Sequence, residues 1–232
     1  MLIRANNIVN KNFRLMLLIV CSLSMTACQT AKSSTPEETK KTSIAKIYDR
    51  LGMAYLEAHD IHRAKQKFIM ALEKAPDIPE PWYSMGYFLE TTGNREKAKE
   101  YYLKAVQLAP TRGDVLNNYG TFLCRSGEYK TAVGYFIKAA QDTKYLEQAS
   151  AYENAGLCSL KIPDQKLAMA YFNKTLEEDP SRSKALLELS ELNYQKGKYD
   201  LARIQLTKYL QLAKPSSQSY LLEKKLDKKL QA

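Results

Sequence analysis

A repeat of 34 residues constrains this chain more than any other feature of its sequence. Gly52, Gly86 and Gly120 lie 34 residues apart, and Gly156 follows 36 residues later. Alanines recur in the same register at Ala64, Ala98, Ala132, Ala168 and Ala202. Large apolar or aromatic residues follow them at Phe68, Tyr102, Phe136, Phe172 and Leu206. A unit of this length cannot bury its apolar face alone, so the chain must stack its units side by side.

Each unit contains the marks of two helices. In the first unit Tyr48, Leu51 and Tyr55 recur at i, i+3 and i+7, which builds one buried helix face. Glycines fall between the two helices of a unit at Gly93, Gly127 and Gly197, and prolines close three units at Pro76, Pro110 and Pro180. A left-handed glycine ends a helix at low cost, and proline cannot continue one.

This pattern resembles the tetratricopeptide repeat (TPR). The resemblance implies an all-α fold, a right-handed superhelix of paired antiparallel helices, with five units at 45–78, 79–112, 113–146, 149–182 and 183–216. The small Gly and Ala positions are expected where the two helices of a unit cross. Pro163 stands where other units have glycine, so the fourth unit should have a different turn. Residues 217–232 predict an amphipathic capping helix, because Leu222, Leu226 and Leu230 recur every four residues. Its lysine face is either solvated or in contact with anionic lipid.

The N-terminus predicts export. Residues 1–14 carry Arg4, Lys11 and Arg14 without an acid, and residues 15–27 hold no charge. That combination is typical of a signal peptide, and the uncharged stretch is too short to favour a spanning helix. The segment Met25-Thr26-Ala27-Cys28 resembles the lipobox of bacterial lipoproteins, which implies lipidation of Cys28; the alternative is an ordinary secretory signal. Gln29 in place of an aspartate favours the outer membrane, with the protein on the inner leaflet and facing the periplasm.

Residues 28–43 are expected to form a flexible tether behind the lipidated cysteine, because Gln29 to Ser43 include no aromatic or large aliphatic residue. Removal of residues 1–27 takes away three basic residues and no acid, which lowers the formal charge from +10 to +7. The reduced charge, the exported compartment and the absence of an aromatic-basic motif argue against a nucleic-acid partner.

No motif in the sequence predicts catalysis. Phosphate-binding glycine loops, nucleophile elbows and metalloprotease motifs are missing, and the helices are all needed for stacking, so we expect neither an enzyme nor a cofactor nor a small-molecule substrate. His59 and His62 are the only histidines, and no neighbouring cysteine completes a metal site around them. They are expected to be surface residues of a turn.

Two cysteines remain after Cys21 leaves with the signal and Cys28 takes lipid. Cys124 and Cys158 fall on the first helices of neighbouring units, at a similar level. Adjacent helices lie ~8–10 Å apart and a disulfide needs Cα atoms within ~7 Å, so a bond requires a favourable crossing. The sequence leaves a disulfide and two buried thiols as alternatives.

The segments 117–124 and 153–158, NNYGTFLC and ENAGLC, resemble the type IV pilus biogenesis lipoprotein family called PilF or PilW. The likeness runs from the lipobox through the repeats. It implies a pilotin, an outer-membrane lipoprotein that helps the secretin PilQ reach the outer membrane and multimerise. TPR lipoproteins of other envelope assembly systems, for outer-membrane protein insertion or peptidoglycan-synthase regulation, are the alternative.

The inner curve of a TPR superhelix is lined by fixed positions of each first helix. Those positions select Tyr83, Tyr87, Glu90, Asn117, Thr121, Arg125, Glu153, Leu157 and Lys161 as a protein-binding groove. Aromatic, amide and charged groups together suit a peptide ligand, with the tyrosines as anchors. Asn117 and Asn118 could instead cap or bridge neighbouring helices.

Overall fold

The computed structural model describes residues 35–231, and this part of the chain consists of helices and their connections. The helices are α2 (Pro36–Glu57), α3 (Ile61–Lys74), α4 (Glu80–Thr91), α5 (Arg95–Leu108), α6 (Gly113–Arg125), α7 (Tyr129–Ala140), α8 (Gln148–Ser159), α9 (Gln165–Glu178), α10 (Ser183–Gln195), α11 (Tyr199–Leu212) and α12 (Ser217–Leu230). The fold is the all-α TPR superhelix that the repeat implies. The stretch from Lys41 onward forms one compact unit. No helix within residues 35–231 is both long and apolar enough to cross a bilayer.

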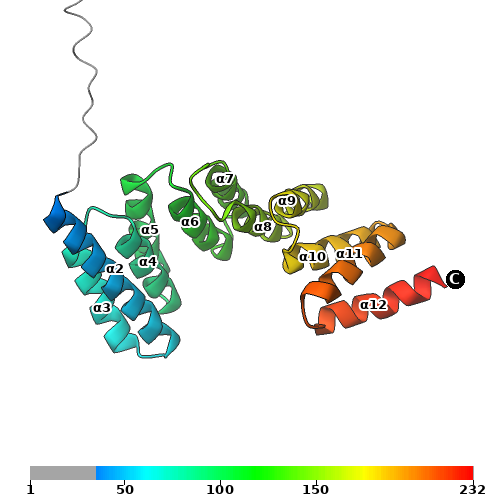
Figure 1. Cartoon of the computed structure of the whole chain (residues 1–232), viewed down its shortest axis with the longest axis horizontal. Coiled ribbons are helices and arrows are strands. Elements are labelled where there is room, and N and C mark those ends of the chain that lie inside the picture. Colours follow the sequence, from blue (N-terminus) through cyan, green and yellow to red (C-terminus); the bar gives the residue numbers. More distant parts are fainter. Residues whose placement is uncertain (1–34, 232) are drawn as a thin grey trace, which may run out of the picture. The chain divides into compact units, whose positions relative to one another are not determined.

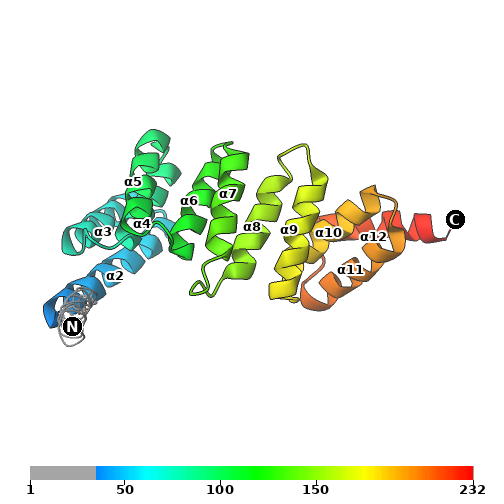
Figure 2. The same cartoon turned by 90° about the horizontal axis from the view of Figure 1, so that it is seen from above.

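Helices pack as consecutive pairs within the stack. The pairs α4–α5, α6–α7, α8–α9 and α10–α11 make the most extensive contacts, and α7 also packs closely on α8 (Figure 1). Figure 2 shows α6, α7, α8 and α9 lying side by side in chain order. Each first helix of a pair therefore has its own partner on one side and the preceding pair on the other.

In the first four pairs a glycine of the first helix lies against an aromatic ring of its partner helix. A Cβ atom placed on Gly52, Gly120 or Gly156 would come within 3.0 Å of the ring of Phe68, Phe136 or Phe172. The five repeating alanines are fully buried, as the crossing of small residues predicts. In the last pair Ser190 takes the glycine position, and its hydroxyl donates to the carbonyl of Ala202 at 2.7 Å.

The turns inside the pairs follow the predicted glycines. Gly93, Gly127 and Gly197 have φ of 88°, 85° and 72°, the left-handed region that ends a helix. His59 has φ 59° at the corresponding position of the first pair. Pro163 cannot adopt a positive φ, and the connection between α8 and α9 runs over residues 160–164 instead of the shorter turn of the other pairs.

The predicted tether is wrong over residues 36–43, which form the first turns of α2. Thr35 explains the start of this helix. Its hydroxyl accepts from the backbone N–H of Glu38 at 3.2 Å, and the Glu38 carboxylate accepts from the backbone N–H of Thr35 at 2.8 Å. This capping box is followed by Pro36 at the first helical position, where proline is favoured. A polar composition excludes a buried core but not an exposed helix. Residues 1–34, with the signal peptide and Cys28, lie outside the described residues.

The C-terminal helix α12 packs against α11 and α10. It begins with a second capping box, in which Ser216 and Ser219 each accept from the backbone N–H of the other. Leu222 and Leu226 are fully buried, but Leu230 is 42% exposed. The capping seam therefore ends one turn earlier than the leucine spacing predicts.

Candidate functional site

A pocket of about 350 Å³ lies between α6 and α8, on the first helices of the third and fourth units. Four of the predicted groove residues line it, namely Thr121, Arg125, Leu157 and Lys161. The remaining lining residues are Cys124, Tyr129, Phe136, Asn154 and Cys158. The pocket thus joins an apolar floor of rings and aliphatic groups to a rim of polar and cationic groups, which is typical of a ligand pocket.

A disulfide between Cys124 and Cys158 forms one wall of the pocket, with Cα atoms 5.9 Å apart. This separation is well below the spacing of ordinary helix neighbours, and it fits disulfide geometry. The bond ties α6 to α8 directly across the pocket.

Arg125 is held on the pocket rim by an acid of the preceding unit. Its Nε and Nη2 atoms donate to the two carboxylate oxygens of Glu90, both at 2.7 Å. The guanidinium also lies 5.7 Å from the centre of the Tyr87 ring. Glu90 hydrogen bonds hold the pKa of Arg125 above its usual value, although partial burial opposes this. Arg125 and Glu90 were both predicted groove residues. In the structure they bind each other and form a bridge between two repeats.

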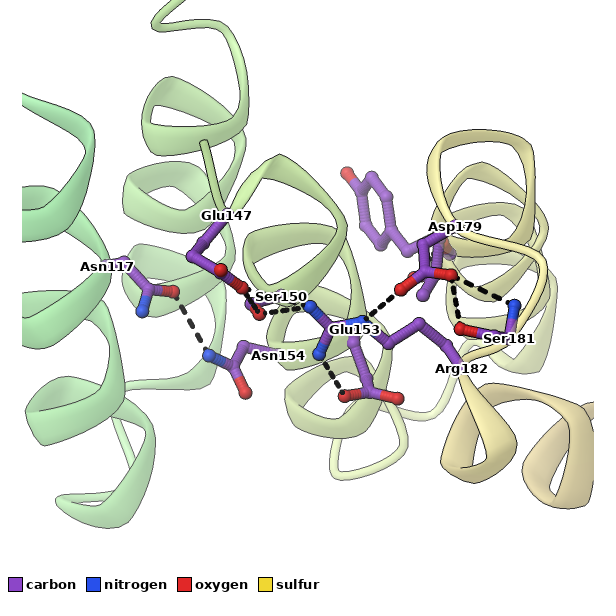
Figure 3. Close-up of polar contacts among 10 residues, drawn as sticks. Asn117, Glu147, Ser150, Glu153, Asn154, Asp179, Ser181 and Arg182 are labelled. Atoms are coloured by element: carbon purple, nitrogen blue, oxygen red, sulfur yellow. Dashed lines mark hydrogen bonds and ion pairs between the residues drawn. The ribbon is translucent and has the colours of Figure 1, made fainter. Parts of the chain in front are cut away.

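Asn117 also bridges two units. The side-chain amide of Asn154 donates to its carbonyl oxygen at 3.0 Å, across α6 and α8 (Figure 3). The hydroxyl of Thr121 donates to the Asn117 backbone carbonyl at 2.8 Å, and Asn118 donates to the Asp114 carbonyl at 2.8 Å. Asn117 therefore bridges two neighbouring helices, whereas Asn118 bonds one turn back within α6 and neither caps nor bridges a neighbouring helix.

Glu153 is engaged by an arginine that the groove prediction did not include. Arg182, just before α10, lies 3.6 Å from Glu153 and 3.1 Å from both Glu147 and Asp179, and it donates to the Ser150 hydroxyl at 2.6 Å (Figure 3). Burial raises the pKa of Glu153, and the positive charge of Arg182 opposes that rise. This network links α8 to the start of α10.

Arg112 makes equivalent contacts two units before Arg182. It precedes α6 and contacts Glu80 of α4 at 3.1 Å and Asp114 at 2.7 Å. The sequence carries a signal for these two arginines, because Pro-Thr-Arg at 110–112 and Pro-Ser-Arg at 180–182 occupy equivalent positions before a first helix. This repeated Pro-x-Arg pattern predicts that Arg112 and Arg182 both make contacts between repeats.

Tyr83 lies among the core side chains rather than free in the groove. It packs against the cluster that contains Tyr102, Tyr119 and Phe122. Burial is the main cause that raises the pKa of its hydroxyl, with Asp114 and Glu80 adding to the rise. Of the two tyrosines predicted as anchors, Tyr87 is the exposed one, at 37%.

A half-buried acid, Asp49, lies close to Tyr83. The Ser84 hydroxyl donates to Asp49 at 3.1 Å, and burial raises the pKa of Asp49 to about 6. This contact joins α4 to α2, so it belongs to the packing between the first two units rather than to the pocket.

The two histidines lie at the first turn, away from the pocket. His62 pairs its Nε2 with the Gln66 side-chain amide at 3.0 Å, one helical turn along α3. Within residues 35–231 no three His, Cys, Asp or Glu side chains gather in a way that could hold a metal ion. The pocket itself presents apolar surface, amide and hydroxyl groups, and cations.

The repeats match known tetratricopeptide-repeat families. The matches cover residues 79–112, 101–134 and 170–217. Over 192 residues the chain is 30% identical to the type IV pilus assembly protein PilF of Pseudomonas aeruginosa, and the match covers 82% of this chain and 76% of that protein.

Two solved structures are similar over most of the chain. A Pseudomonas aeruginosa PilF structure has a TM-score of 0.76 and 30% identity, and the match covers 83% of this chain and 86% of that one. A structure of PilW, described as a widely conserved type IV pilus biogenesis factor, has a TM-score of 0.71 and 28% identity, over 81% of this chain and 86% of its own.

Proposed function

Since this chain belongs to the PilF/PilW family of TPR proteins of type IV pilus biogenesis, we propose that it acts as a pilotin that binds the secretin PilQ. In this role the protein is an outer-membrane lipoprotein, anchored through Cys28 on the inner leaflet and facing the periplasm. It promotes the outer-membrane localisation and the multimerisation of PilQ. The observation that carries the proposal is the likeness to PilF along 82% of the chain, which spans the repeats rather than one of them.

The architecture supports a role in protein binding without catalysis. The pocket between α6 and α8 presents an apolar floor, amide groups and two cations on helices that the disulfide and the inter-repeat bridges hold in place. A preorganised surface of this kind loses little conformational entropy when a partner binds. PilQ would be held on the scaffold by such contacts, with no bond made or broken.

Deletion and capture experiments test the role. A strain that lacks the gene should lose heat-resistant PilQ multimers and twitching motility, while other outer-membrane barrel proteins stay at normal levels. Normal PilQ multimers in the deletion strain would contradict the pilotin role, and a general loss of barrel proteins would favour an envelope assembly scaffold of another system.

A surface variant tests where PilQ binds. Tyr87→Ala removes an exposed aromatic side chain of the groove, and Leu103→Ala removes an equally exposed apolar side chain from α5, both at 37% exposure. We expect co-purification of PilQ to fall several-fold with Tyr87→Ala and to stay unchanged with Leu103→Ala, because truncating a binding anchor costs on the order of 1–2 kcal/mol. Equal capture by both variants would move the binding site away from this groove.

A further inference from the structure

Three pockets adjoin one another along the unusual turn of the fourth unit. The pocket between α6 and α8 that the Cys124–Cys158 bond lines is called the disulfide pocket. It shares Tyr129 and Lys161 with a second pocket of about 330 Å³, which is also lined by Ile162 and Pro163. That pocket in turn shares Pro163 with a third, of about 690 Å³, which reaches Lys196 in the turn between α10 and α11. We call these three pockets together the turn furrow. The longer connection around Pro163 creates the middle of it, so the furrow is specific to this unit.

The turn furrow carries an unbalanced positive charge. Lys130, Lys161, Lys166 and Lys196 line it, and none of them forms an ion pair within residues 35–231. The two acids of the furrow are already engaged: Glu128 binds Lys99 at 2.8 Å, and Asp164 caps α9 by accepting from two backbone N–H groups. Four lysines outside the ion pairs of the described chain leave a field that favours an anionic ligand.

The disulfide pocket at one end of the furrow suits a single apolar side chain. Leu157, Tyr129 and Cys124 provide the accessible part of its apolar lining, because Phe136 and Cys158 are each only 1% exposed, and its volume is at the low end for ligand pockets. No acid lines this pocket, whereas Arg125 and Lys161 both do. Asn154 uses one amide hydrogen on Asn117 and keeps the other for a ligand. The rim therefore offers donors, which match backbone carbonyls or carboxylates.

We propose that the turn furrow binds an acidic peptide segment, with one large apolar side chain of that segment in the disulfide pocket and its carboxylates facing Lys161, Lys166 and Lys196. The inference rests on the proposed function, and it specifies the chemistry of the segment that the partner presents. It adds a charged contact at the turns of the third to fifth units, beside the disulfide, to the groove contact that Tyr87→Ala tests.

Two labelled peptides test the chemistry directly. The full chain, purified in detergent, is titrated against a fluorescent acidic peptide that carries one central phenylalanine among aspartates and glutamates, and against the same peptide with lysines in place of the acids. We expect the acidic probe to bind at least tenfold tighter, with an affinity that falls as salt rises. Equal binding of both probes, or no binding of the acidic probe, would overturn the proposal.

Charge reversal in the furrow provides the matched test. The double variant Lys161→Glu, Lys196→Glu should weaken binding of the acidic probe at least tenfold. Lys208→Glu, on α11 and outside the furrow, reverses one lysine where the furrow variant reverses two, and it should leave binding within twofold of the wild type. Replacing the central phenylalanine of the probe by alanine should weaken binding to the wild-type chain several-fold. An unchanged affinity of the furrow variant, with its helical content intact by circular dichroism, would refute the site.

Complementation separates this inference from the pilotin role. If deletion of the gene leaves PilQ multimers intact, the pilotin role fails, whatever the peptides show. If deletion abolishes the multimers and the Lys161→Glu, Lys196→Glu variant restores them fully, the pilotin role stands and the furrow is not its binding site. Failure of the double variant to restore them, with restoration by Lys208→Glu, supports both.

Discussion

The crossing glycines set the distance between the two helices of a repeat. At Gly120 an added Cβ would lie 2.9 Å from the Phe136 ring and 3.3 Å from the Ala132 carbonyl oxygen. Neither neighbour can move easily, because Phe136 is 1% exposed and Ala132 is fully buried. Any side chain at this position must push α6 and α7 apart.

Gly120→Ala should therefore destabilise the protein by about 1–3 kcal/mol, the usual cost of overpacking a tight core. The control is Gly134→Ala in α7, where an added Cβ meets nothing within 4 Å. That change should be neutral or stabilising by up to about 1 kcal/mol, because alanine favours a helix more than glycine does. Chemical denaturation of both variants measures the difference. A Gly120→Ala protein as stable as the wild type would show that the seam is not tight.

Asp49 makes stability depend on pH. Burial raises its folded-state pKa from 3.8 to about 6, while the Ser84 hydroxyl group lowers it and Glu80 raises it further. Between these two values the folded chain binds more protons than the unfolded chain, so this group makes the free energy of unfolding fall as pH rises from about 4 to 6.

Asp49→Asn should remove this dependence and keep an oxygen for the Ser84 hydroxyl. We expect the variant to be more stable than the wild type at pH 7, on the order of 1–2 kcal/mol, and equal to it near pH 4. Thermal unfolding across this pH range measures the difference. A constant offset between the two proteins at all pH values would contradict a role for the Asp49 charge.

At the scale of the elements, contacts between first helices of successive repeats supplement the ordinary pair packing. The disulfide and the Asn117–Asn154 bond join α6 to α8, and Arg182 joins α8 to the start of α10. These contacts lie beside the pocket or on the same helices that form it. They hold the spacing of the helices that present Thr121, Leu157 and Lys161 to a ligand.

The disulfide should be a stabilising cross-link between these elements. Thiol labelling of the denatured, unreduced protein should modify neither Cys124 nor Cys158, because their sulfur atoms are bonded to each other. The bond closes a loop between residues 34 apart in sequence. A loop of this length predicts a loss of about 3–4 kcal/mol in the free energy of unfolding for the Cys124→Ala, Cys158→Ala variant, through greater entropy of the unfolded chain. Reduced wild type should match that variant. Two reactive thiols in the native preparation would contradict the bond.

At the scale of the whole molecule, we expect the repeat stack to fold independently of the proposed anchor. The stack from Lys41 onward is one compact unit with its own buried core. Cys28 lies before the described residues.

Cys28→Ser should therefore leave helical content and thermal midpoint unchanged and move the protein out of the outer-membrane fraction, because acyl chains supply the membrane affinity of a lipoprotein. Membrane fractionation followed by immunoblotting measures the shift, with PilQ multimers scored in the same samples. Unchanged fractionation of Cys28→Ser would contradict lipidation as the anchor. Loss of helical content would contradict the independence of the stack.

The sequence alone determined the fold. A 34-residue unit can bury its apolar face only against neighbouring units, and the small residues in register mark where the two helices of each unit cross. The glycine turns, the alanine seam and the distinct Pro163 turn could all be predicted from local chemistry, because each depends on one residue and its neighbours along the chain. The start of α2 could have been predicted too, since the Thr35, Pro36 and Glu38 signals are local.

Only the tertiary structure decided which groove residues remain available. The sequence placed Glu90, Arg125 and Glu153 on one surface, but the structure pairs Glu90 with Arg125 and gives Glu153 to Arg182. It packs the half-buried Tyr83 against a core cluster and leaves Lys161 without an ion pair among the described residues. Each of these outcomes depends on the distance between side chains about 30 residues apart, and that distance is set by helix crossings and connection lengths. The sequence determines which helices carry these groups, whereas close packing decides which of the groups meet.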